Sequence, residues 1–435
     1  RGNNAGDGYV LARLAVERGI AVLVREIDSS KPPAGDAGEA RARALEAGIR
    51  PEPMAGDGIG DADVIIDGIF GTGLDRPVEG RWREAIEQVN ESVAPVLALD
   101  IPSGLHADTG AVMGVAVRAA ACISFIGLKR GLFTARGPDV AGEVHFDDLG
   151  VPPHIHERVT ADAYLDRLNA FSGLLGPRPR DAHKGRFGHL LVVGGEQGYA
   201  GAARLAAEAA LRCGAGLVSI ATRRAHAHVI NAGRYEIMAR GVERGPELAP
   251  QLEQATVVVA GPGLGRSEWS QELLGAVLEA GKPTVLDADA LNLVAELKPS
   301  LPASAVMTPH PGEAGRLLGS DAAGVESDRF AAVADLTARF GRVCVLKGAG
   351  SLTAGTGEPA FVCAHGNPGM ASGGMGDVLS GVIGALMAQG LDAESAARAG
   401  VCVHARAGDL AAAGGERGTL ASDLMPHLRD LINVL

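Results

Sequence analysis

The sequence predicts an α/β protein with two domains, each built on a largely parallel β-sheet. Short runs rich in Val, Leu and Ile, such as 189–193, 257–260 and 343–346, alternate with Ala-rich segments of helical length. This alternation is typical of parallel sheets covered by helices. Most of the apolar runs end at a glycine or a charged residue, which is where such folds gather their ligand-binding groups. The length of 435 residues suits two or three domains.

The composition argues against several classes of function. There are 52 acidic and 40 basic residues, giving a net charge of −12, which disfavours nucleic acid or an anionic membrane as partner. The five cysteines are dispersed without a C-x-x-C pair, which fits buried thiols in a reducing cytoplasm better than a disulfide framework or a zinc site. No uncharged apolar run reaches the ~18 residues of a membrane span, and no signal peptide is recognisable. We therefore expect a cytoplasmic homo-oligomer that acts on a small molecule.

Residues 1–150 are expected to form the first domain. The chain as given begins inside a ligand-type loop with no strand before it, followed by a helix over 9–17 and a strand over 20–25. Strands over 63–67 and 96–100 end in Asp67 and Asp100, and another over 119–126 leads to Lys129. The carboxyl ends of parallel strands share one edge of a sheet. A lone strand-terminal aspartate usually serves a turn, but two beside an Asn-Asn loop favour a ligand site.

A linker is predicted over 150–165, and the second domain over 163–435. The linker's His154 and His156 fit solvent exposure better than metal binding, because no further ligand accompanies them. Strand ends of the second domain carry polar groups that each have an ordinary structural explanation. The acid could serve a turn, the histidine could be a core or capping residue, and the lysine could be solvated. Their common position after buried strands favours one shared site, made of Gly263, Asp287, Asp289, His310, Glu313, Lys347 and Asp377.

The segment from Gly366 to Asp377 carries the strongest signal. Four glycines fall in the span from Gly369 to Gly376, both ends included, and a helix is predicted to follow through Gln389. Glycine lets the backbone approach an anion closely, and a helix N-terminus offers free N–H groups to it. Asp377 then lies in the first helical turn beside that anion. A carboxylate in this position suits proton removal from a hydroxyl, although it could also serve only as a helix cap.

Gly373-Gly374-Met375-Gly376-Asp377 resembles the phosphoryl-transfer signature of the ribokinase-like superfamily. With blocks at 183–185, 261–265, 286–292, 308–313 and 347–350, the second domain resembles the ADP-dependent NAD(P)H-hydrate dehydratases, which implies a ribokinase-like α/β/α fold and Asp377 as catalytic base. The resemblance implies that the nucleotide is held by Lys347, Gly348, Ala349, Gly350, Ser351, Asn367, Pro368, Gly369, Met370, Ala371, Ser372, Gly373, Gly374, Met375 and Gly376. It implies that the hydrated dinucleotide contacts Ala202, Gly265, His310, Pro311, Gly312, Glu313, Ala314, Gly315, Arg316 and Asp377.

The first domain resembles the NAD(P)H-hydrate epimerases, and so a Rossmann-like fold, through its Asn-Asn loop, residues 71–77 and residues 100–104. Ala5 stands where the family has glycine, and the helix and strand that precede the loop in the family are missing from this sequence, so the domain is expected to be N-terminally incomplete. The resemblance implies substrate contacts from Asn3, Asn4, Ala5, Gly6, Asp7, Gly71, Thr72, Gly73, Leu74, Asp75, Arg76, Pro77 and Asp100. It also implies a potassium site made by Asn4, Asp67 and Ser103.

The order of the two domains resembles the bifunctional NAD(P)H-hydrate repair enzymes of bacteria. This resemblance implies that the R and S hydrates of NADH and NADPH are interconverted, and that the S form is dehydrated with ADP as phosphoryl donor, giving AMP and phosphate. Mg²⁺ is expected on the phosphates, held mainly through them and water. Two other hypotheses remain open on the sequence: a small-molecule kinase of the vitamin or sugar type, and a first domain that binds a nucleotide without epimerase activity.

Overall fold

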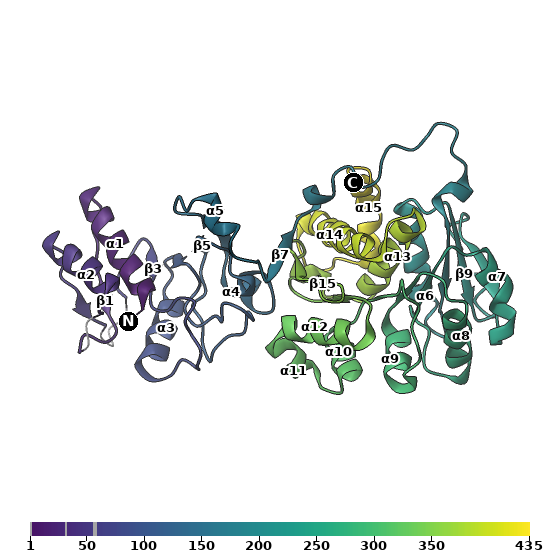
Figure 1. Ribbon diagram of the computed structural model, residues 1–435, viewed down its shortest axis with the longest axis horizontal. Coiled ribbons are helices and arrows are strands. Elements are labelled where there is room, and N and C mark those ends of the chain that lie inside the picture. The colour runs from purple at the N-terminus through teal and green to yellow at the C-terminus, as the bar shows by residue number, and fades with distance from the viewer. Residues whose placement is uncertain (1, 31–32, 55–58) are drawn as a thin grey trace. The chain divides into compact units, whose positions relative to one another are not determined.

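The computed structural model describes residues 2–30, 33–54 and 59–435. Two compact units make up the chain, residues 1–160 and 161–435, and the elements of each are labelled in Figure 1.

A four-stranded parallel sheet, ordered β3-β4-β5-β6, forms the centre of the first unit. Strands β1 and β2 pair in parallel with each other and form a separate two-stranded sheet. Buried residues of α1 and α2 form a small core of their own around Tyr9 and Ala44. The strands are β1 (Arg25–Glu26), β2 (Glu52–Pro53), β3 (Ile65–Asp67), β4 (Val96–Leu99), β5 (Ala121–Phe125) and β6 (Glu143–Asp147). The helices are α1 (Asn3–Glu17), α2 (Asp36–Glu46), α3 (Gly80–Glu91), α4 (Gly137–Val140) and α5 (Pro153–His156).

Two predictions for the first unit are wrong. The Asn-Asn segment is not a loop: helix α1 begins at Asn3 and includes it. Asn and Gly are weak helix formers, but tertiary packing overrides this, because a Cβ on Gly6 would lie 3.0 Å from the Cα of Ala37 in α2. The strand predicted over 20–25 is reduced to the two-residue β1, whose partner β2 is equally short.

The second unit is built on a ten-stranded sheet ordered β10-β9-β8-β11-β12-β13-β14-β15-β16-β7. All neighbouring strands are parallel except at β15, which runs antiparallel to β14 and β16. The strands are β7 (Ala163–Asp166), β8 (His189–Val193), β9 (Leu217–Thr222), β10 (Met238–Gly241), β11 (Val257–Ala260), β12 (Thr284–Leu286), β13 (Val306–Met307), β14 (Val343–Leu346), β15 (Leu352–Ala354) and β16 (Ala360–Cys363). The helices are α6 (Ala200–Arg212), α7 (Ala249–Gln254), α8 (Glu268–Glu279), α9 (Ala288–Leu297), α10 (Pro311–Leu318), α11 (Ala322–Ser327), α12 (Arg329–Phe340), α13 (Met375–Ala388), α14 (Ala393–Ala411) and α15 (Leu424–Ile432).

The end of the predicted linker is in fact an edge strand. β7 pairs in parallel with β16, and the Tyr164 ring stacks on Phe361 with 5.6 Å between ring centroids. The buried Asp166 accepts two hydrogen bonds from Arg398 of α14, at 2.9 and 3.0 Å. Only four residues long and half exposed, β7 lacks the apolar run that marks the central strands.

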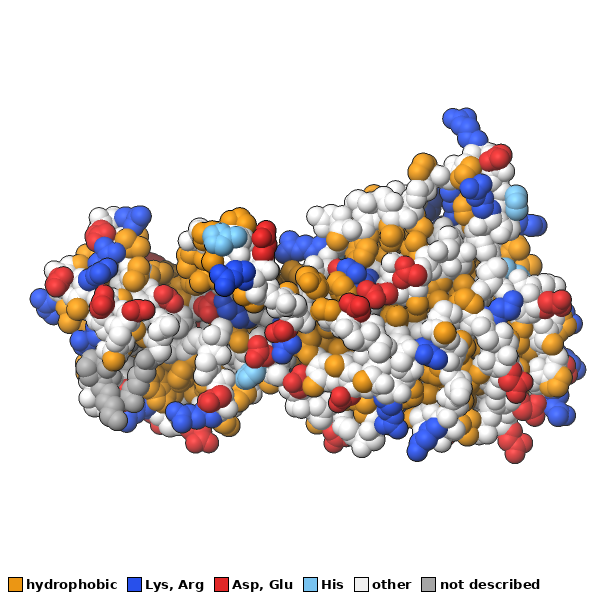
Figure 2. Space-filling model, viewed as in Figure 1, with side chains coloured by type: hydrophobic (Ala, Val, Ile, Leu, Met, Phe, Trp, Pro, Cys, Tyr) orange, Lys and Arg blue, Asp and Glu red, His pale blue; other side chains and the backbone are white. Residues whose placement is uncertain are grey.

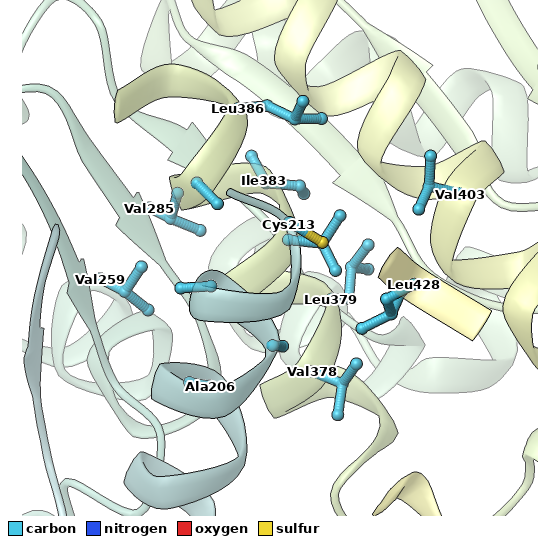
Figure 3. Close-up of a cluster of buried hydrophobic side chains, with 14 of the residues drawn as sticks. Ala206, Cys213, Val259, Val285, Val378, Leu379, Ile383, Leu386, Val403 and Leu428 are labelled. Atoms are coloured by element: carbon cyan, nitrogen blue, oxygen red, sulfur yellow. The ribbon is translucent and has the colours of Figure 1, made fainter. Parts of the chain in front are cut away.

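Helix α13 is held in the middle of the second unit's main core. Figure 3 shows side chains of α13, α6 and neighbouring strands packed around Cys213 and Leu379. The contact between α13 and α6 is close because glycine permits it: a Cβ on Gly381 would lie 2.1 Å from the carbonyl oxygen of Ala206. Twelve of the helix's residues are buried, so its N-terminus is fixed rigidly beside the carboxyl end of β12.

Acidic and basic side chains are mixed over the face seen in Figure 2. Over the described part of the chain, the helices are too short or too polar to cross a membrane.

Candidate functional site

The glycine turn before α13 presents backbone rather than side chains. Gly374 is the N-cap of α13 with φ +93°, and a Cβ there would lie 2.6 Å from Leu205 Cδ1. An added Cβ on the exposed Gly373 would meet no atom within 4 Å, so this side of the turn is open. The first backbone N–H groups of α13 have no intrahelical partner and are available to an anion at the helix N-terminus. Asp377 lies in the first turn of the helix.

Lys347 is the charged centre of the site. It follows β14, and its Nζ lies 2.6 Å from Asp287 Oδ1 and 3.8 Å from Glu313 Oε2. Ser380, one turn into α13, donates to the other oxygen of Asp287 at 2.7 Å. Burial alone would raise the pKa of Asp287, but Lys347 and the hydrogen bonds hold it below its ordinary value. A Cβ on Gly376 would lie 3.3 Å from Lys347 Nζ, so the ammonium reaches the glycine turn.

Asp377 has the electrostatic properties of a base that works near neutral pH. Its pKa is raised to about 7, first by burial and then by the negative charge of Asp287, with Asp289 and Glu313 adding to the effect. The charge of Lys347 opposes this rise only in part. Several carboxylates around one ammonium therefore keep the proton on Asp377 to a much higher pH than on an ordinary aspartate.

His310 is a capping histidine, one of the alternatives that the sequence left open. Its Nδ1 accepts from the backbone N–H groups of Gly312 and Glu313, and Glu313 Oε2 accepts from the His310 backbone N–H at 2.8 Å. Because Nδ1 is an acceptor, the proton of the neutral ring is on Nε2. Burial lowers the pKa of His310, and the charges of Lys347 and Arg316 lower it further. Nε2 lies 3.3 Å from Glu313 Oε1, and the ring is half exposed, so a ligand that reaches Nε2 would share it with Glu313.

Residues predicted to contact the dinucleotide form a hydrogen-bonded row beside this cap. Asp289 Oδ2 accepts from the Gly265 N–H at 2.8 Å, and Asn292 links Asp289 to Arg316, whose Nε donates to Asn292 Oδ1 at 2.8 Å. Ala202 approaches the 261–265 loop, since a Cβ on Gly263 would lie 3.1 Å from its Cβ. Of the remaining predicted contacts in α10, Ala314 and Gly315 are buried and Pro311 is partly exposed. A Cβ on Gly315 would lie 2.7 Å from the backbone of Asp321, so Gly315 has a packing role.

The predicted nucleotide loop is held by Asp409 of α14. Asp409 accepts from the Gly366 N–H at 3.1 Å and from Asn367 Nδ2 at 3.1 Å, while Asn367 Oδ1 caps the short helix Pro368–Met370 through the Gly369 N–H. The Lys-Gly turn after β14 rests on the buried Arg329, which donates to the carbonyl of Lys347 at 3.1 Å. The turn and the loop both lie at the carboxyl edge of the sheet, where β14 and β16 end.

Sequence reasoning missed three of these contributors, Ser380, Arg329 and Asp409. The first two are buried, Asp409 is partly so, and all three come from helices rather than from strand ends. Spacing could have revealed Ser380, since it lies four residues after Gly376 and donates to its carbonyl. No comparable signal marks Arg329 or Asp409.

In the first unit, the three residues predicted to hold potassium lie together. Ser103 donates to Asp67 Oδ1 at 2.6 Å and to the Phe70 carbonyl at 3.2 Å, and Asn4 Nδ2 donates to the same carbonyl at 2.6 Å. Asn4, Asp67 and Ser103 are each at most 5% exposed. Asn4 Oδ1 is buried without a hydrogen-bond partner among the described residues. Burial raises the pKa of Asp67 despite its hydrogen bonds, so a cation here would relieve both the carboxylate and the orphaned oxygen.

Asp100 lies at the end of β4 and is held by Lys129. The Lys129 ammonium contacts Asp100 Oδ1 and donates to the Phe125 carbonyl at 2.8 Å. Asp7 of α1 lies within electrostatic range of Asp100: burial raises the pKa of Asp7, and the charge of Asp100 raises it further. Loop 71–77 approaches Asn4 of α1, since a Cβ on Gly71 would lie 3.2 Å from the Cβ of Asn4. Thr72, Gly73, Asp75, Arg76 and Pro77 are exposed on it.

Two family descriptions match the chain. NAD(P)H-hydrate dehydratase matches residues 190–429, and the YjeF-related protein N-terminus matches residues 1–131. A bifunctional NAD(P)H-hydrate repair enzyme of Coxiella burnetii is 48% identical over 439 residues, covering 100% of this chain and 89% of the relative. The chain belongs to the bifunctional NAD(P)H-hydrate repair enzymes. The family resemblance and the fold class inferred from the motifs are thereby confirmed.

A second relative and a solved structure are similar to the chain in the same way. A repair enzyme of the same name from Escherichia coli K12 is 44% identical over 443 residues, covering 99% of this chain and 84% of the relative. Among solved structures, an ADP/ATP-dependent NAD(P)H-hydrate dehydratase of Bacillus subtilis, co-crystallised with ATP and Mg²⁺, matches with a TM-score of 0.55 and 27% identity. It covers 61% of this chain and 95% of its own. A vitamin or sugar kinase is not favoured, because the match extends over both units.

Proposed function

We propose that the chain repairs hydrated NADH and NADPH in two steps. The first unit interconverts the R and S hydrates, and the second dehydrates the S form with ADP as donor, yielding AMP and phosphate. The observation that carries the proposal is the position of Asp377: a carboxylate with a pKa of about 7 in the first turn of α13, beside an open glycine turn and Lys347.

The chemistry of the second unit follows from the leaving group. Hydroxide leaves poorly, so the hydroxyl of the hydrate is first phosphorylated and then eliminated as phosphate. Asp377 takes the proton of the hydroxyl as it attacks the donor phosphorus. The N–H groups around Gly374 and Gly376 and the Lys347 ammonium hold the phosphoryl oxygens and stabilise the charge that develops on them. Mg²⁺ bound to the phosphates would neutralise further charge.

His310 and its neighbours are proposed to hold the hydrated nicotinamide next to Asp377. His310 offers Nε2–H, and Arg316 offers its remaining N–H groups from a side chain already oriented by Asn292. The nucleotide is proposed to lie over the Lys-Gly turn and the Asn367 loop. Arg329 would hold the backbone of the Lys-Gly turn in place, and Asp409 would hold the Asn367 loop.

In the first unit, K⁺ is proposed to bind at Asn4, Asp67 and Ser103. The donors are hard oxygens, only one of them charged, and Asn4 Oδ1 has no other partner among the described residues. A bound K⁺ would fix α1 against the strand ends and so set the position of Asp7 and Asp100 around the substrate.

The direct test is to offer the hydrate of NADH with ADP and follow the return of the reduced nicotinamide absorbance. Asp377→Asn is expected to lower this rate by at least ~10³-fold while ADP binding, measured by calorimetry, changes little. Asp335→Asn, which alters an exposed acid of α12, is the matched control and is expected to behave as wild type. Undiminished dehydration by Asp377→Asn would contradict the assignment of the base.

A further inference from the structure

The candidate site of the first unit contains an ion pair between Lys129 and Asp100. The side chains of Lys129 and Asp100 are 16% and 18% exposed. The pair is therefore mostly buried, but a ligand can still contact it. The ammonium uses two of its three N–H groups, on Asp100 Oδ1 and on the Phe125 carbonyl. Asp100 Oδ1 also accepts from the Phe125 N–H at 3.1 Å, whereas none of the described residues donates to Oδ2. One N–H and one carboxylate oxygen are therefore left for a ligand.

The backbone is strained at both ends of this pair. Asp100 has φ +68°, and Ile126, three residues before Lys129, has φ +64°. A β-branched residue rarely adopts this left-handed conformation, and the Ile126 side chain is 49% exposed, so packing of that side chain does not explain it. The turn at Ile126 brings the chain back so that Lys129 reaches the end of its own strand β5. Such strain is typical of residues positioned for function.

We propose that Lys129 and Asp100 form the acid–base pair of epimerisation, with Lys129 exchanging a proton with the ring nitrogen N1 of the hydrate. This inference rests on the proposed epimerase activity of the first unit. It gives a catalytic role to Asp100, which was predicted only as a substrate contact, and to Lys129, which the sequence placed at the same edge of the sheet without a role.

The reaction has a simple proton balance. The hydroxyl of the hydrate is on C6 next to N1, so C6 is a hemiaminal carbon. Asp100 Oδ2 takes the hydroxyl proton, the O–H electron pair forms a C=O bond, and the C6–N1 bond breaks. Its electron pair goes to N1, which takes a proton from Lys129. The open form carries an aldehyde at C6 and an N–H at N1, while Asp100 is protonated and Lys129 is neutral.

Rotation about the C5–C6 bond then turns the other face of the aldehyde toward N1. N1 attacks C6 and returns its proton to Lys129, and Asp100 gives its proton back to the oxygen. The ring closes with the opposite configuration at C6. No atom is oxidised or reduced and no co-reactant is consumed, so the pair is sufficient for both directions.

The test compares Lys129→Arg and Lys129→Met in the full chain, using the R hydrate of NADH and chromatographic separation of the epimers. Arginine keeps the charge and the hydrogen bonds to Asp100, but its pKa above ~12 makes it a poor proton donor. We expect both variants to lose at least ~100-fold in kcat for epimerisation. Lys129→Arg should keep a KM near that of wild type, because the ion pair is preserved.

Arg136→Met serves as the control, since it removes an exposed arginine paired with Asp139 in the same unit, and it should epimerise as wild type. Dehydration of the S hydrate is an internal control in every variant. If Lys129→Arg keeps most of the wild-type kcat, Lys129 only anchors Asp100 and the proposal is overturned. If wild type dehydrates the S hydrate but never converts the R hydrate, the proposed epimerase function itself fails.

Discussion

At the scale of single residues, the second unit's site is governed by an imbalance of charge. Lys347 faces Asp287 and Glu313 directly, and Asp377 and Asp289 add negative charge around them. Lys347 and Ser380 keep Asp287 ionised. The negative charge of Asp287 then raises the pKa of Asp377. A base works best when its pKa is near the working pH, and burial together with the charge of Asp287 brings the pKa of Asp377 there.

The first prediction concerns pH. In the free enzyme, kcat/KM for dehydration should rise tenfold per pH unit up to about pH 7 and level off above it, because only ionised Asp377 can take the proton. Steady-state rates in buffers of constant ionic strength would measure this profile. A flat rate between pH 5 and 8, or a plateau reached near ~4 as for an ordinary aspartate, would contradict the assignment.

The second prediction concerns stability. The pKa of Asp377 is about 7 in the folded protein against an ordinary 3.8, so ionised Asp377 destabilises the fold above pH 7 and has no such effect below pH 4. Asp377→Asn should therefore raise the free energy of unfolding on the order of 2 kcal/mol at pH 8, and the gain should shrink as pH falls. Urea unfolding at pH 8 and pH 5 would measure both values. An equal or larger gain at pH 5 would contradict the explanation.

Sequence alone located the charged groups at the strand ends, because buried apolar runs are easy to recognise and parallel strands share an edge. It could not show that His310 uses Nδ1 to cap its own helix, or that Ser380 donates a hydrogen bond to Asp287. The His310 cap is local, but the orientation of the ring decides it, and the Ser380–Asp287 contact joins residues 93 positions apart in the chain. The raised pKa of Asp377 depends on its burial and on the nearby charge of Asp287, which the sequence does not show either.

At the scale of elements, helix α13 is packed in the hydrophobic core along its length and carries site residues at its N-terminus. Its buried length packs on α6 and the central strands, and its first turn carries the glycines and Asp377. Helix and strand predictions succeeded where local pattern and burial agree, as for β8 over 189–193. They failed at α1 and β7, where packing on α2 and pairing with β16 decide the structure.

The third prediction tests the anion turn through Gly376. This residue is helical with no positive φ, so Gly376→Ala should preserve or slightly raise stability. The added Cβ would, however, lie 3.3 Å from Lys347 Nζ and 3.5 Å from Asp287 Oδ2, in the approach to the phosphoryl group. We expect dehydration to fall at least ~10-fold with weaker ADP binding. Gly275→Ala in α8, where a Cβ meets nothing within 4 Å, should match wild type in rate, and an equal loss there would contradict the interpretation.

At the scale of the whole molecule, each unit has its own sheet, its own buried clusters and its own set of site residues. The two activities should therefore be removable one at a time by substitutions that leave the other unit folded.

The fourth prediction uses an equal mixture of R and S hydrates with excess ADP. Wild type should convert the whole mixture to NADH. Asp100→Asn, chosen because asparagine tolerates the left-handed conformation of residue 100, should convert the S half at the wild-type rate and then slow to the rate of spontaneous epimerisation. Asp377→Asn should produce no NADH yet still interconvert the epimers, and mixing the two variants should restore full conversion. If Asp100→Asn also lost dehydration of the S half, the sites would not be independent, and the division of labour between the units would be wrong.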